Sequence, residues 1–468
     1  MTGITRYGAY VPPTRLPIGA LGGRAAAEGG PEKAIAWSDE DAITLAVAAG
    51  RNCLRDFDRS QVDGLIFAST THPFREKQAA ALIARALDLR RDIHSTDLAG
   101  SLRAGTAALR TARDAVEAGS SRNVLVIASD CRMAAPGSAL EANLGDGAAA
   151  FLVGDQAVIA HLEDSHTISD EIVDVWRGQD DAFSHSWEDR FVVQEGYAPR
   201  IREAVEGLLA KLGRIPGDYA RYALYAPDKR SHAAAARAIG IQADRLQDPL
   251  FGRLGNTGAA FAPMQLAASL ETANPGDRLL VASYGDGAEA LSFEITDTAQ
   301  PNGSARGISW NLDRSRTVAS YDHYLKARGL GPREWADAAG PGLSATVHFR
   351  ERDDDLSFRG QVCRQCNAVQ FPAQRVCESC FSRDAFDAIC LADRVGRVVT
   401  YTLDFFFPTP DPPTLVSVVE IDGARVHLQV ADCAAEDIKI GMELGFSFRR
   451  IHQAGGRPNY FWKGVPLA

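Results

Sequence analysis

The chain has 468 residues, with 50 Lys and Arg against 60 Asp and Glu, a net charge of −10 and a pI near 5.6. This length allows two or three domains, and an acidic chain lacks the concentrated basic surface that nucleic-acid-binding proteins use. Its start lacks the features of a signal peptide, and no run approaches the roughly 18 apolar residues of a membrane span. We therefore expect a cytoplasmic protein with neither nucleic acid nor membrane as a partner.

Apolar runs alternate with Ala-rich segments over the first 300 residues, a pattern typical of helices covering a buried sheet. We expect helices over 41–54, 78–87 and 105–118, and strands over 62–69, 123–129 and 279–283. The sequence Gly145-Asp146-Gly147-Ala148 is echoed 140 residues later by Gly285-Asp286-Gly287-Ala288, and each copy follows a strand ending in Ala-Ser. We interpret this echo as a duplicated half-domain.

The remaining third of the chain has a different character. Residues 298–307 are polar and carry Gly and Pro, which is typical of a linker, and residues 310–330 are predicted to form a short helical connector. Short β-rich segments follow at 397–403, 415–421, 425–430 and 443–450, and they predict a small β-barrel. The expected boundaries are 1–297, a linker with a short helix over 298–344, then 345–387 and 388–468.

Four of the eight cysteines form two Cys-x-x-Cys knuckles, Cys363 with Cys366 and Cys377 with Cys380, separated by ten residues. This spacing lets four thiolates close a tetrahedron around one Zn²⁺, and a filled tetrahedron leaves no open position, so the metal should be structural. Iron in a rubredoxin-like site is the chemical alternative. A redox role for these cysteines is the other alternative, but redox cysteines would not be expected as a matched pair of knuckles.

Three segments around this cluster carry a resemblance to a known family: Gln370-Phe371-Pro372 between the knuckles, Gly396 to Thr402, and Asn459 to Lys463 near the end. Together they resemble the DUF35 family. The resemblance implies a rubredoxin-like zinc ribbon over 345–387 and an OB-fold over 388–468. Modules of this family accompany thiolase-like enzymes, which implies an acyl-CoA context.

The first 297 residues resemble the 3-hydroxy-3-methylglutaryl-CoA synthase branch of the thiolase superfamily, which is related to ketoacyl synthase III. The matching segments are spread over the region, at 7–12, 130–141, 145–154, 255–258 and 276–285. The resemblance implies an α/β thiolase-like fold of duplicated βαβαβ halves, layered α-β-α-β-α. It also implies a coenzyme A thioester as substrate and a homodimer formed through this domain.

Enzymes of that branch use a Cys nucleophile at a buried helix N-terminus, where backbone N–H groups and the helix dipole stabilise thiolate and oxyanion. In the matching segment Leu102 stands at that position. The family's His corresponds to Tyr225, its Glu general acid to Thr70, and its oxyanion-hole Asn to Asn256. Because leucine cannot form a thioester, we do not expect an acetyl-Cys intermediate.

Three functions stay open. In the first, Tyr225 exchanges a proton with a β-oxygen while Asn256 stabilises a thioester enolate, which gives retro-aldol or retro-Claisen cleavage, or its reverse, without an acyl-enzyme. In the second, Ser101 is the nucleophile of a synthase-like condensation, although it needs an adjacent base. In the third, the chain is a non-catalytic acyl-CoA-binding scaffold, and Tyr225 only fills the space of the His.

Other residues complete the expected site. His185 is a candidate replacement base, with a plain surface-loop position as the alternative. We expect Leu102, Arg230 and Tyr284 to contact the substrate, with Arg230 supplying a cation for the phosphates of coenzyme A.

Overall fold

The computed structural model describes residues 1–178, 180–298, 306–331 and 344–467. The chain divides into two compact units. The first comprises Met1–Ala36, Asp41–Ala81 and Leu89–Tyr324, and the second comprises Trp37–Glu40, Leu82–Asp88 and Leu325–Ala468. The first unit thus continues past the expected boundary at residue 297. Within the described ranges, every helix is too short or too polar to cross a membrane.

The α-helices of the described residues are α1 (Ala42–Cys53), α2 (Ala79–Ala86), α3 (Ala104–Glu117), α4 (Asp189–Phe191), α5 (Ala198–Leu212), α6 (Lys229–Ile239), α7 (Phe261–Leu270), α8 (Ile308–Leu312), α9 (Tyr321–Ala327) and α10 (Ala345–Ser357). A π-helical turn, η4 (Val192–Tyr197), leads into α5. The helices predicted over 41–54, 78–87 and 105–118 correspond to α1, α2 and α3.

The strands before residue 320 are β1 (Gly3–Tyr10), β2 (Thr14–Pro17), β3 (Glu32–Ala34), β4 (Gly64–Ala68), β5 (His94–Leu98), β6 (Asn123–Cys131), β7 (Asp146–Gly154), β8 (Ala160–Ser169), β9 (Val175–Trp176), β10 (His185–Ser186), β11 (Arg221–Leu224), β12 (Arg278–Tyr284), β13 (Gly287–Ile295) and β14 (Arg316–Thr317). Nine of them form one sheet in the order β11-β12-β13-β8-β1-β7-β6-β4-β5.

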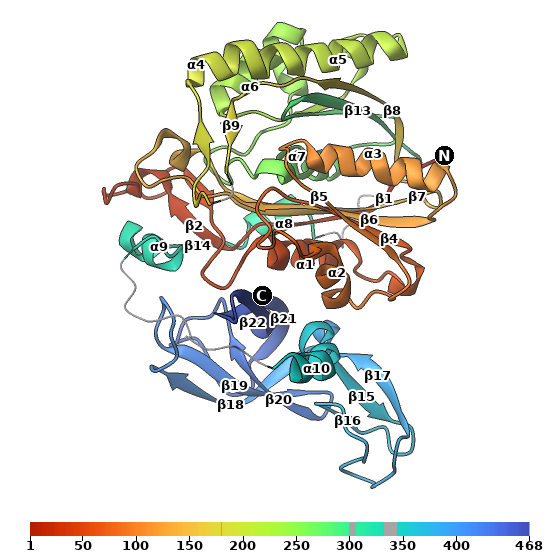
Figure 1. Cartoon of the computed structure of the whole chain (residues 1–468), viewed down its shortest axis with the longest axis vertical. Helices are drawn as coiled ribbons and strands as arrows, with labels where there is room; N and C mark the ends of the chain where they lie inside the picture. The colour runs from red at the N-terminus through yellow and green to blue at the C-terminus, as the bar shows by residue number, and fades with distance from the viewer. Residues whose placement is uncertain (179, 299–305, 332–343, 468) are drawn as a thin grey trace. The chain divides into compact units, whose positions relative to one another are not determined.

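The first unit is layered, with helices outside and between two parts of this sheet (Figure 1). Helix α1 packs on β1 and β7, α5 packs on β8 and β13, and α3 and α7 contact each other between the two parts. Nearly every residue of α7 is buried, as expected of a helix enclosed on both sides. This α-β-α-β-α arrangement is the thiolase-like fold that the resemblance implied.

The two halves of this unit repeat one pattern. Strand β6 pairs antiparallel with β7, and β12 pairs antiparallel with β13; each second strand then pairs antiparallel with the first strand of its own half, β1 or β8. The Gly145 and Gly285 segments both lead into the second strand of such a pair. The connection is long in the first half, 132–145, and a two-residue turn in the second, so the echo marks equivalent places with different loops.

The expected connector over 310–330 contains a strand as well as helices. Between α8 and α9, β14 pairs parallel with β2 through Arg316↔Thr14 and Thr317↔Arg15. These residues belong to the first unit, because a partner about 300 residues earlier in the chain holds them. The polar linker expected at 298–307 lies almost wholly outside the described residues.

The second unit contains a small three-stranded sheet of β15 (Arg359–Cys363), β16 (Val369–Gln370) and β17 (Phe386–Cys390). A closed barrel follows, built of β18 (Gly396–Asp404), β19 (Thr414–Ile421), β20 (Ala424–Val430), β21 (Glu443–Ala454) and β22 (Arg457–Pro466), in the order β18-β19-β20-β22-β21 (Figure 1). Along β20, buried and outward residues alternate, as in a strand with one face in the barrel core. The strands predicted from the sequence correspond to β18–β21.

Candidate functional site

Tyr225 comes directly after β11, at the carboxyl end of the parallel pair β11–β12. Its backbone is fixed on both sides: its N–H donates to the Ala282 carbonyl at 2.8 Å, and its own carbonyl accepts from the Tyr197 hydroxyl at 2.8 Å. The side chain is 4% exposed. The ends of parallel strands are common places for ligand sites in α/β sheets.

Aromatic rings surround Tyr225. Its centroid lies 6.4 Å from that of Tyr197, 5.4 Å from that of Phe261 and 6.2 Å from that of Tyr284. Tyr197 and Tyr284 also meet edge to face at 5.7 Å. Such packing holds the Tyr225 ring in one orientation and lowers the local dielectric.

Burial raises the pKa of the Tyr225 phenol. The guanidinium of Arg132 and the amide of Asn256 act in the opposite direction, because both stabilise a phenolate, whereas the Asp174 carboxylate adds to the rise. The phenol is therefore neutral near pH 7, with a cation and an amide placed to stabilise the charge it acquires on losing its proton.

Asn256 is held by the backbone. Its Nδ2 donates to the Ala226 carbonyl at 2.9 Å, and its Oδ1 accepts from the Gly258 N–H at 2.9 Å. A side-chain amide has two N–H groups, so one donor is left beside Tyr225. With 1% exposure, this donor lies in a site largely closed to water.

Thr70 donates hydrogen bonds to Asp130, which is the centre of a larger hydrogen-bond network. The buried Asp130 carboxylate accepts from the Thr70 hydroxyl at 2.9 Å and the Thr70 N–H at 2.7 Å. It also accepts from Ser69, Thr71 and the Ala259 N–H at 2.8–3.0 Å. These bonds tie the end of β4 and the loop before α7 to β6. Thr70 thus has its hydroxyl committed to a structural network.

The start of α3 carries Ser101 and Leu102. The Ser101 hydroxyl donates to the Gly285 carbonyl at 3.1 Å and accepts from the Arg103 N–H at 3.4 Å. A Cβ on Gly285 would lie 2.9 Å from the Leu102 nitrogen and 2.8 Å from the Ser101 Oγ, so only glycine permits this approach. Leu102 packs against the core. The helix N-terminus is preserved, and both hydrogen bonds of the Ser101 Oγ go to backbone groups, so among the described residues no base takes its proton.

The structure does not bring His185 into this group. Its side chain is 47% exposed, pairs with Asp181 at 3.2 Å and stacks on Trp176 with centroids 5.6 Å apart. These contacts belong to a surface hairpin of β9 and β10. Arg230 is also exposed, in the first turn of α6.

Tyr284 does join the Tyr225 group. Burial, followed by the Asp174 carboxylate, raises its pKa. Its hydroxyl lies so close to Gly196 in η4 that a Cβ there would come within 2.4 Å of it. The site thus combines Tyr225, Asn256 and Tyr284 from the sequence-based prediction.

Three members of this group were missed by the sequence analysis: Arg132, Asp174 and Tyr197. Arg132 and Asp174 are buried charged residues in or beside irregular loops, and Tyr197 ends the π-helical turn. The weak signal available was the Asp130-Cys131-Arg132 sequence at the end of a predicted strand, where charged residues are unusual unless they have partners.

The four cysteines of the second unit meet in one place. Cys363 and Cys380 Sγ lie 3.7 Å apart, Cys366 and Cys377 Sγ lie 3.6 Å apart, and all four lie within 4.8 Å of one another. Zn–S bonds of about 2.3 Å give a tetrahedron with edges of about 3.8 Å, so the thiols fit a zinc ion. All four positions are taken by protein, and the zinc is therefore structural.

Gln370, between the two knuckles in the chain, holds the second knuckle by its side chain. Its amide oxygen accepts from the Glu378 N–H at 3.2 Å, and its Nε2 donates to the Val376 carbonyl at 3.3 Å. The buried glutamine between the knuckles thus fixes the second knuckle, which explains its place in the Gln370-Phe371-Pro372 motif.

Comparison with protein families gives two matches. Residues 350–387 match the ChsH2 rubredoxin-like zinc ribbon domain, and residues 96–171 match 3-oxoacyl-[acyl-carrier-protein] synthase III. Relatives over a longer range include the hydroxymethylglutaryl-CoA synthase of Pyrococcus horikoshii, 31% identical over 335 residues, which are 70% of this chain and 95% of that protein. The synthase of Methanocaldococcus jannaschii is 30% identical over 342 residues, 70% of this chain and 99% of that protein.

Solved structures share the fold at lower identity. MvaS in complex with 3-hydroxy-3-methylglutaryl coenzyme A matches with a TM-score of 0.62 and 22% identity, over 72% of this chain and 95% of that one. The 3-oxoacyl-[acyl-carrier-protein] synthase III of Aquifex aeolicus matches with a TM-score of 0.57 and 20% identity, over 63% of this chain and all of that one. The chain therefore belongs to the hydroxymethylglutaryl-CoA synthase family of the thiolase superfamily, and it carries in addition a ChsH2-type zinc ribbon followed by a β-barrel.

Proposed function

We propose that the protein makes or breaks a carbon–carbon bond in a β-oxygenated acyl-CoA thioester without forming an acyl-enzyme. The observation that carries this proposal is the buried Tyr225 phenol beside Asn256 and Arg132, in a family member that has leucine at the position of the nucleophile. The relatives named hydroxymethylglutaryl-CoA synthases support the acyl-CoA substrate class.

In the bond-forming direction, one acyl thioester loses its α-proton to water as its enolate forms, and the enolate attacks the carbonyl carbon of a second molecule; after the step the Tyr225 phenolate regains a proton from water. As the enolate's electron pair forms the new bond, the carbonyl oxygen takes the proton of Tyr225, which starts neutral because burial raises its pKa. Arg132 stabilises the resulting phenolate. The remaining N–H of Asn256, which faces the Tyr225 oxygen before substrate binds, turns to the thioester oxygen that carries the enolate charge, and Arg132 is left to stabilise the phenolate. In the cleaving direction the same steps run backwards: Tyr225 first loses its proton to water, the phenolate takes the β-hydroxyl proton as the carbon–carbon bond breaks, and the released enolate is protonated by water.

The condensing alternative with Ser101 has less support. A serine nucleophile needs a base that removes its proton, and the Ser101 hydroxyl instead donates to the Gly285 carbonyl. The scaffold alternative is opposed by the partners of Tyr225. A tyrosine that only filled space would not need a buried cation and a fixed amide beside its hydroxyl.

Incubation of the protein with acetyl-CoA and with β-hydroxy- and β-ketoacyl-CoAs tests these alternatives. Product analysis and intact-mass measurement are run on the same samples. Turnover without a mass adduct is the expected result. An acyl adduct lost in Ser101→Ala would instead establish the serine route, and CoA binding without turnover of any thioester would favour the scaffold.

Two further features belong to this proposal. We infer a homodimer formed through the first unit, which is supported by β5 lying at the end of the nine-stranded sheet with one edge outside the sheet. We also infer a cytoplasmic location, where reduced thiols would be available for zinc. Size-exclusion chromatography with light scattering at several concentrations tests the dimer.

A further inference from the structure

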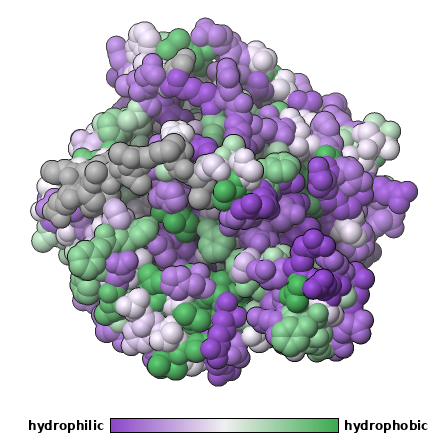
Figure 2. Space-filling model, turned by 60° about the horizontal axis from the view of Figure 1, so that its bottom comes forward, coloured by the Kyte–Doolittle hydropathy of each residue, from purple (hydrophilic) through white to green (hydrophobic). Residues whose placement is uncertain are grey.

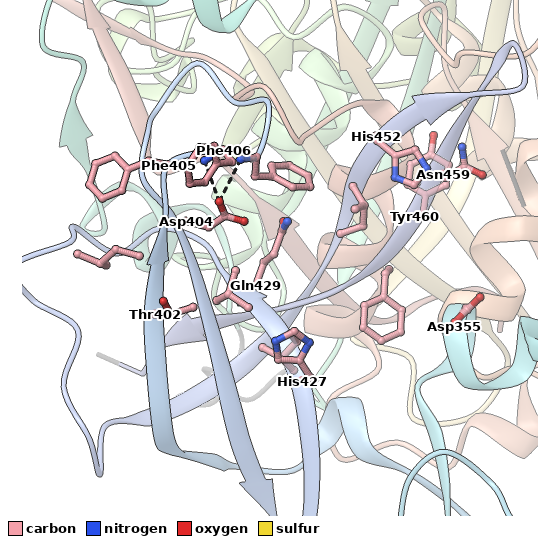
Figure 3. Close-up of a pocket in the computed structure, with 16 residues that line it drawn as sticks. Asp355, Thr402, Asp404, Phe405, Phe406, His427, Gln429, His452, Asn459 and Tyr460 are labelled. Atoms are coloured by element: carbon pink, nitrogen blue, oxygen red, sulfur yellow. Dashed lines mark hydrogen bonds between the residues drawn. The ribbon is translucent and has the colours of Figure 1, made fainter. Parts of the chain in front are cut away.

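A pocket of about 780 Å³ opens on the outer face of the barrel, within the second unit (Figure 3). This volume is in the range of small-molecule sites, which are about 300–1,000 Å³. Neither the zinc site nor Tyr225 is part of it. The chemistry proposed at Tyr225 therefore does not account for this pocket.

The floor of the pocket is a row of side chains on three neighbouring strands. Thr402 on β18 pairs with Val416 on β19, and Val416 pairs with Gln429 on β20. Paired residues in a sheet point to the same face, so these three project outwards together. His427, two residues before Gln429, lies on the same face.

Aromatic residues form much of the wall. Phe405, Phe406 and Phe407 line one side, and Tyr460 and Phe461 of β22 line the other. Phe405 is 66% exposed and Phe406 is 97% exposed. Exposing this much apolar side-chain surface to water is unfavourable in free energy. In the space-filling view, green apolar side chains stand among purple ones on the face that comes forward (Figure 2).

The loop that carries these phenylalanines is held in place. The Asp404 carboxylate accepts from the Phe406 N–H at 2.8 Å and from the Phe407 N–H at 3.2 Å (Figure 3). An aspartate that binds the backbone two and three residues ahead fixes a turn. The aromatic wall is therefore presented by an ordered turn.

The charge of the lining selects against anions. Asp355 and Asp404 contribute carboxylates, while no Lys or Arg of the described residues lines the pocket. OB-folds that bind nucleic acid use cations along the groove together with stacking aromatics. This pocket has aromatic residues without the cations, and a phosphate-bearing ligand part would meet repulsion there.

We propose that the pocket binds the uncharged hydrocarbon chain or ring system of a small molecule. Neutral hydrogen-bonding groups that can orient a hydroxyl or carbonyl on such a ligand also line the pocket, namely Thr402, His427, Gln429, His452, Asn459 and Tyr460. The same chemistry is offered by a free neutral lipid and by the acyl end of an acyl-CoA whose phosphates stay outside. This binding is independent of catalysis at Tyr225.

Titration of the full-length protein with the neutral fluorescent dye Nile red tests the pocket. Thr402→Glu places a carboxylate in the pocket, and Thr400→Glu is the matched control, since both threonines are exposed on β18 and only Thr402 lines the pocket. We expect Thr402→Glu to weaken binding about tenfold and Thr400→Glu to change it less than about twofold. A second pair, Phe406→Ala against Phe381→Ala, compares two exposed phenylalanines, of which only Phe406 lines the pocket.

Competition identifies the source of the ligand. Displacement of the dye by 1-decanol alone supports a free neutral lipid, and displacement by both 1-decanol and decanoyl-CoA supports the acyl end of a thioester. CoA and a single-stranded oligonucleotide should fail to displace it. Equal dye binding by Thr402→Glu and Thr400→Glu, or displacement by CoA or the oligonucleotide, would overturn the proposal.

Discussion

The zinc ribbon and the Tyr225 site differ in what they keep of their families. The ribbon has all four cysteines, with sulfurs spaced for one tetrahedral ion. At the Tyr225 site the structure retains the helix N-terminus and a buried Asn256, while the family resemblance places Leu102, Tyr225 and Thr70 at the other three expected positions. A structural zinc site needs all four of its protein ligands, and loss of one ligand weakens the binding of the ion. A catalytic pocket whose fold is held by backbone contacts can exchange side chains and keep its shape.

The largest effect is expected at the ribbon. Cys377→Ser removes one of four ligands, and because structural zinc contributes about 10 kcal/mol or more of binding free energy, the zinc should be lost and residues 359–390 should unfold. Metal analysis and limited proteolysis measure this change. Cys433 is half-buried and lies outside the cluster, so Cys433→Ser should retain the zinc. Full zinc content in Cys377→Ser would refute the four-ligand assignment.

At the Tyr225 site, loss of one hydroxyl should affect chemistry rather than folding. Tyr225→Phe keeps the aromatic packing and removes the proton donor, so turnover should fall by about 10²–10⁴-fold. The measurement is kcat with the thioester found active in the screen, together with the affinity for CoA. Phe261→Tyr adds a hydroxyl in the same aromatic cluster and serves as a matched control for repacking. A Tyr225→Phe protein as active as the parent would rule out proton transfer by Tyr225.

The hydrogen-bond network at Asp130 gives a third test, since it ties the end of β4 and the loop before α7 to β6. Asp130→Asn removes charge and places an NH₂ group among donors, so several charge-assisted hydrogen bonds are lost and stability should fall by about 4 kcal/mol. Urea unfolding of the first unit measures this. Asp58→Asn changes an exposed aspartate whose bonds are local and should cost far less. Equal midpoints for the two variants would contradict a structural role for Asp130.

The smallest expected effect is a pH dependence of stability that involves the first unit and not the second. Burial lowers the pKa of His232 from 6.5 to about 4 in the folded protein. Between these values the unfolded chain binds more protons, so stability falls as the pH drops through 6.5 towards 4, by up to about 3 kcal/mol. Unfolding of the first unit at pH 7 and pH 4.5 should show this loss, and His232→Gln should reduce it. The exposed His427→Gln should leave it unchanged.

The sequence predicts most of the framework, because it depends on periodic burial and on short-range spacing. Helices α1, α2 and α3 show the alternation of small apolar and polar residues typical of covering helices, and Cys363 to Cys380 form a local ligand set. The position of β14 was not predictable. It pairs with a strand about 300 residues away, and two residues carry no pattern of their own.

The sequence predicted some residues of the site, but it did not predict the charged residues that surround Tyr225. Family motifs point to Tyr225, Asn256 and Thr70. Arg132 and Asp174 were missed because they lie in loops, where the chain path and not a periodic pattern decides which charges meet. His185 lies on an exposed hairpin, which corresponds to the surface-loop alternative that the sequence left open beside a role as base.

The π-helical turn before α5 has a consequence for how this family can change. A π turn holds one residue more than an α turn, and each residue rotates a helix by about 100°. If α5 keeps its position on β8 and β13, deleting one residue from Val192–Gly196 leaves Tyr197, which directly precedes α5, bonded to the Tyr225 carbonyl and rotates the segment ahead of the deletion. The turn is thus a place where one residue gained or lost re-orients α4 and leaves both the sheet and the aromatic cluster unchanged.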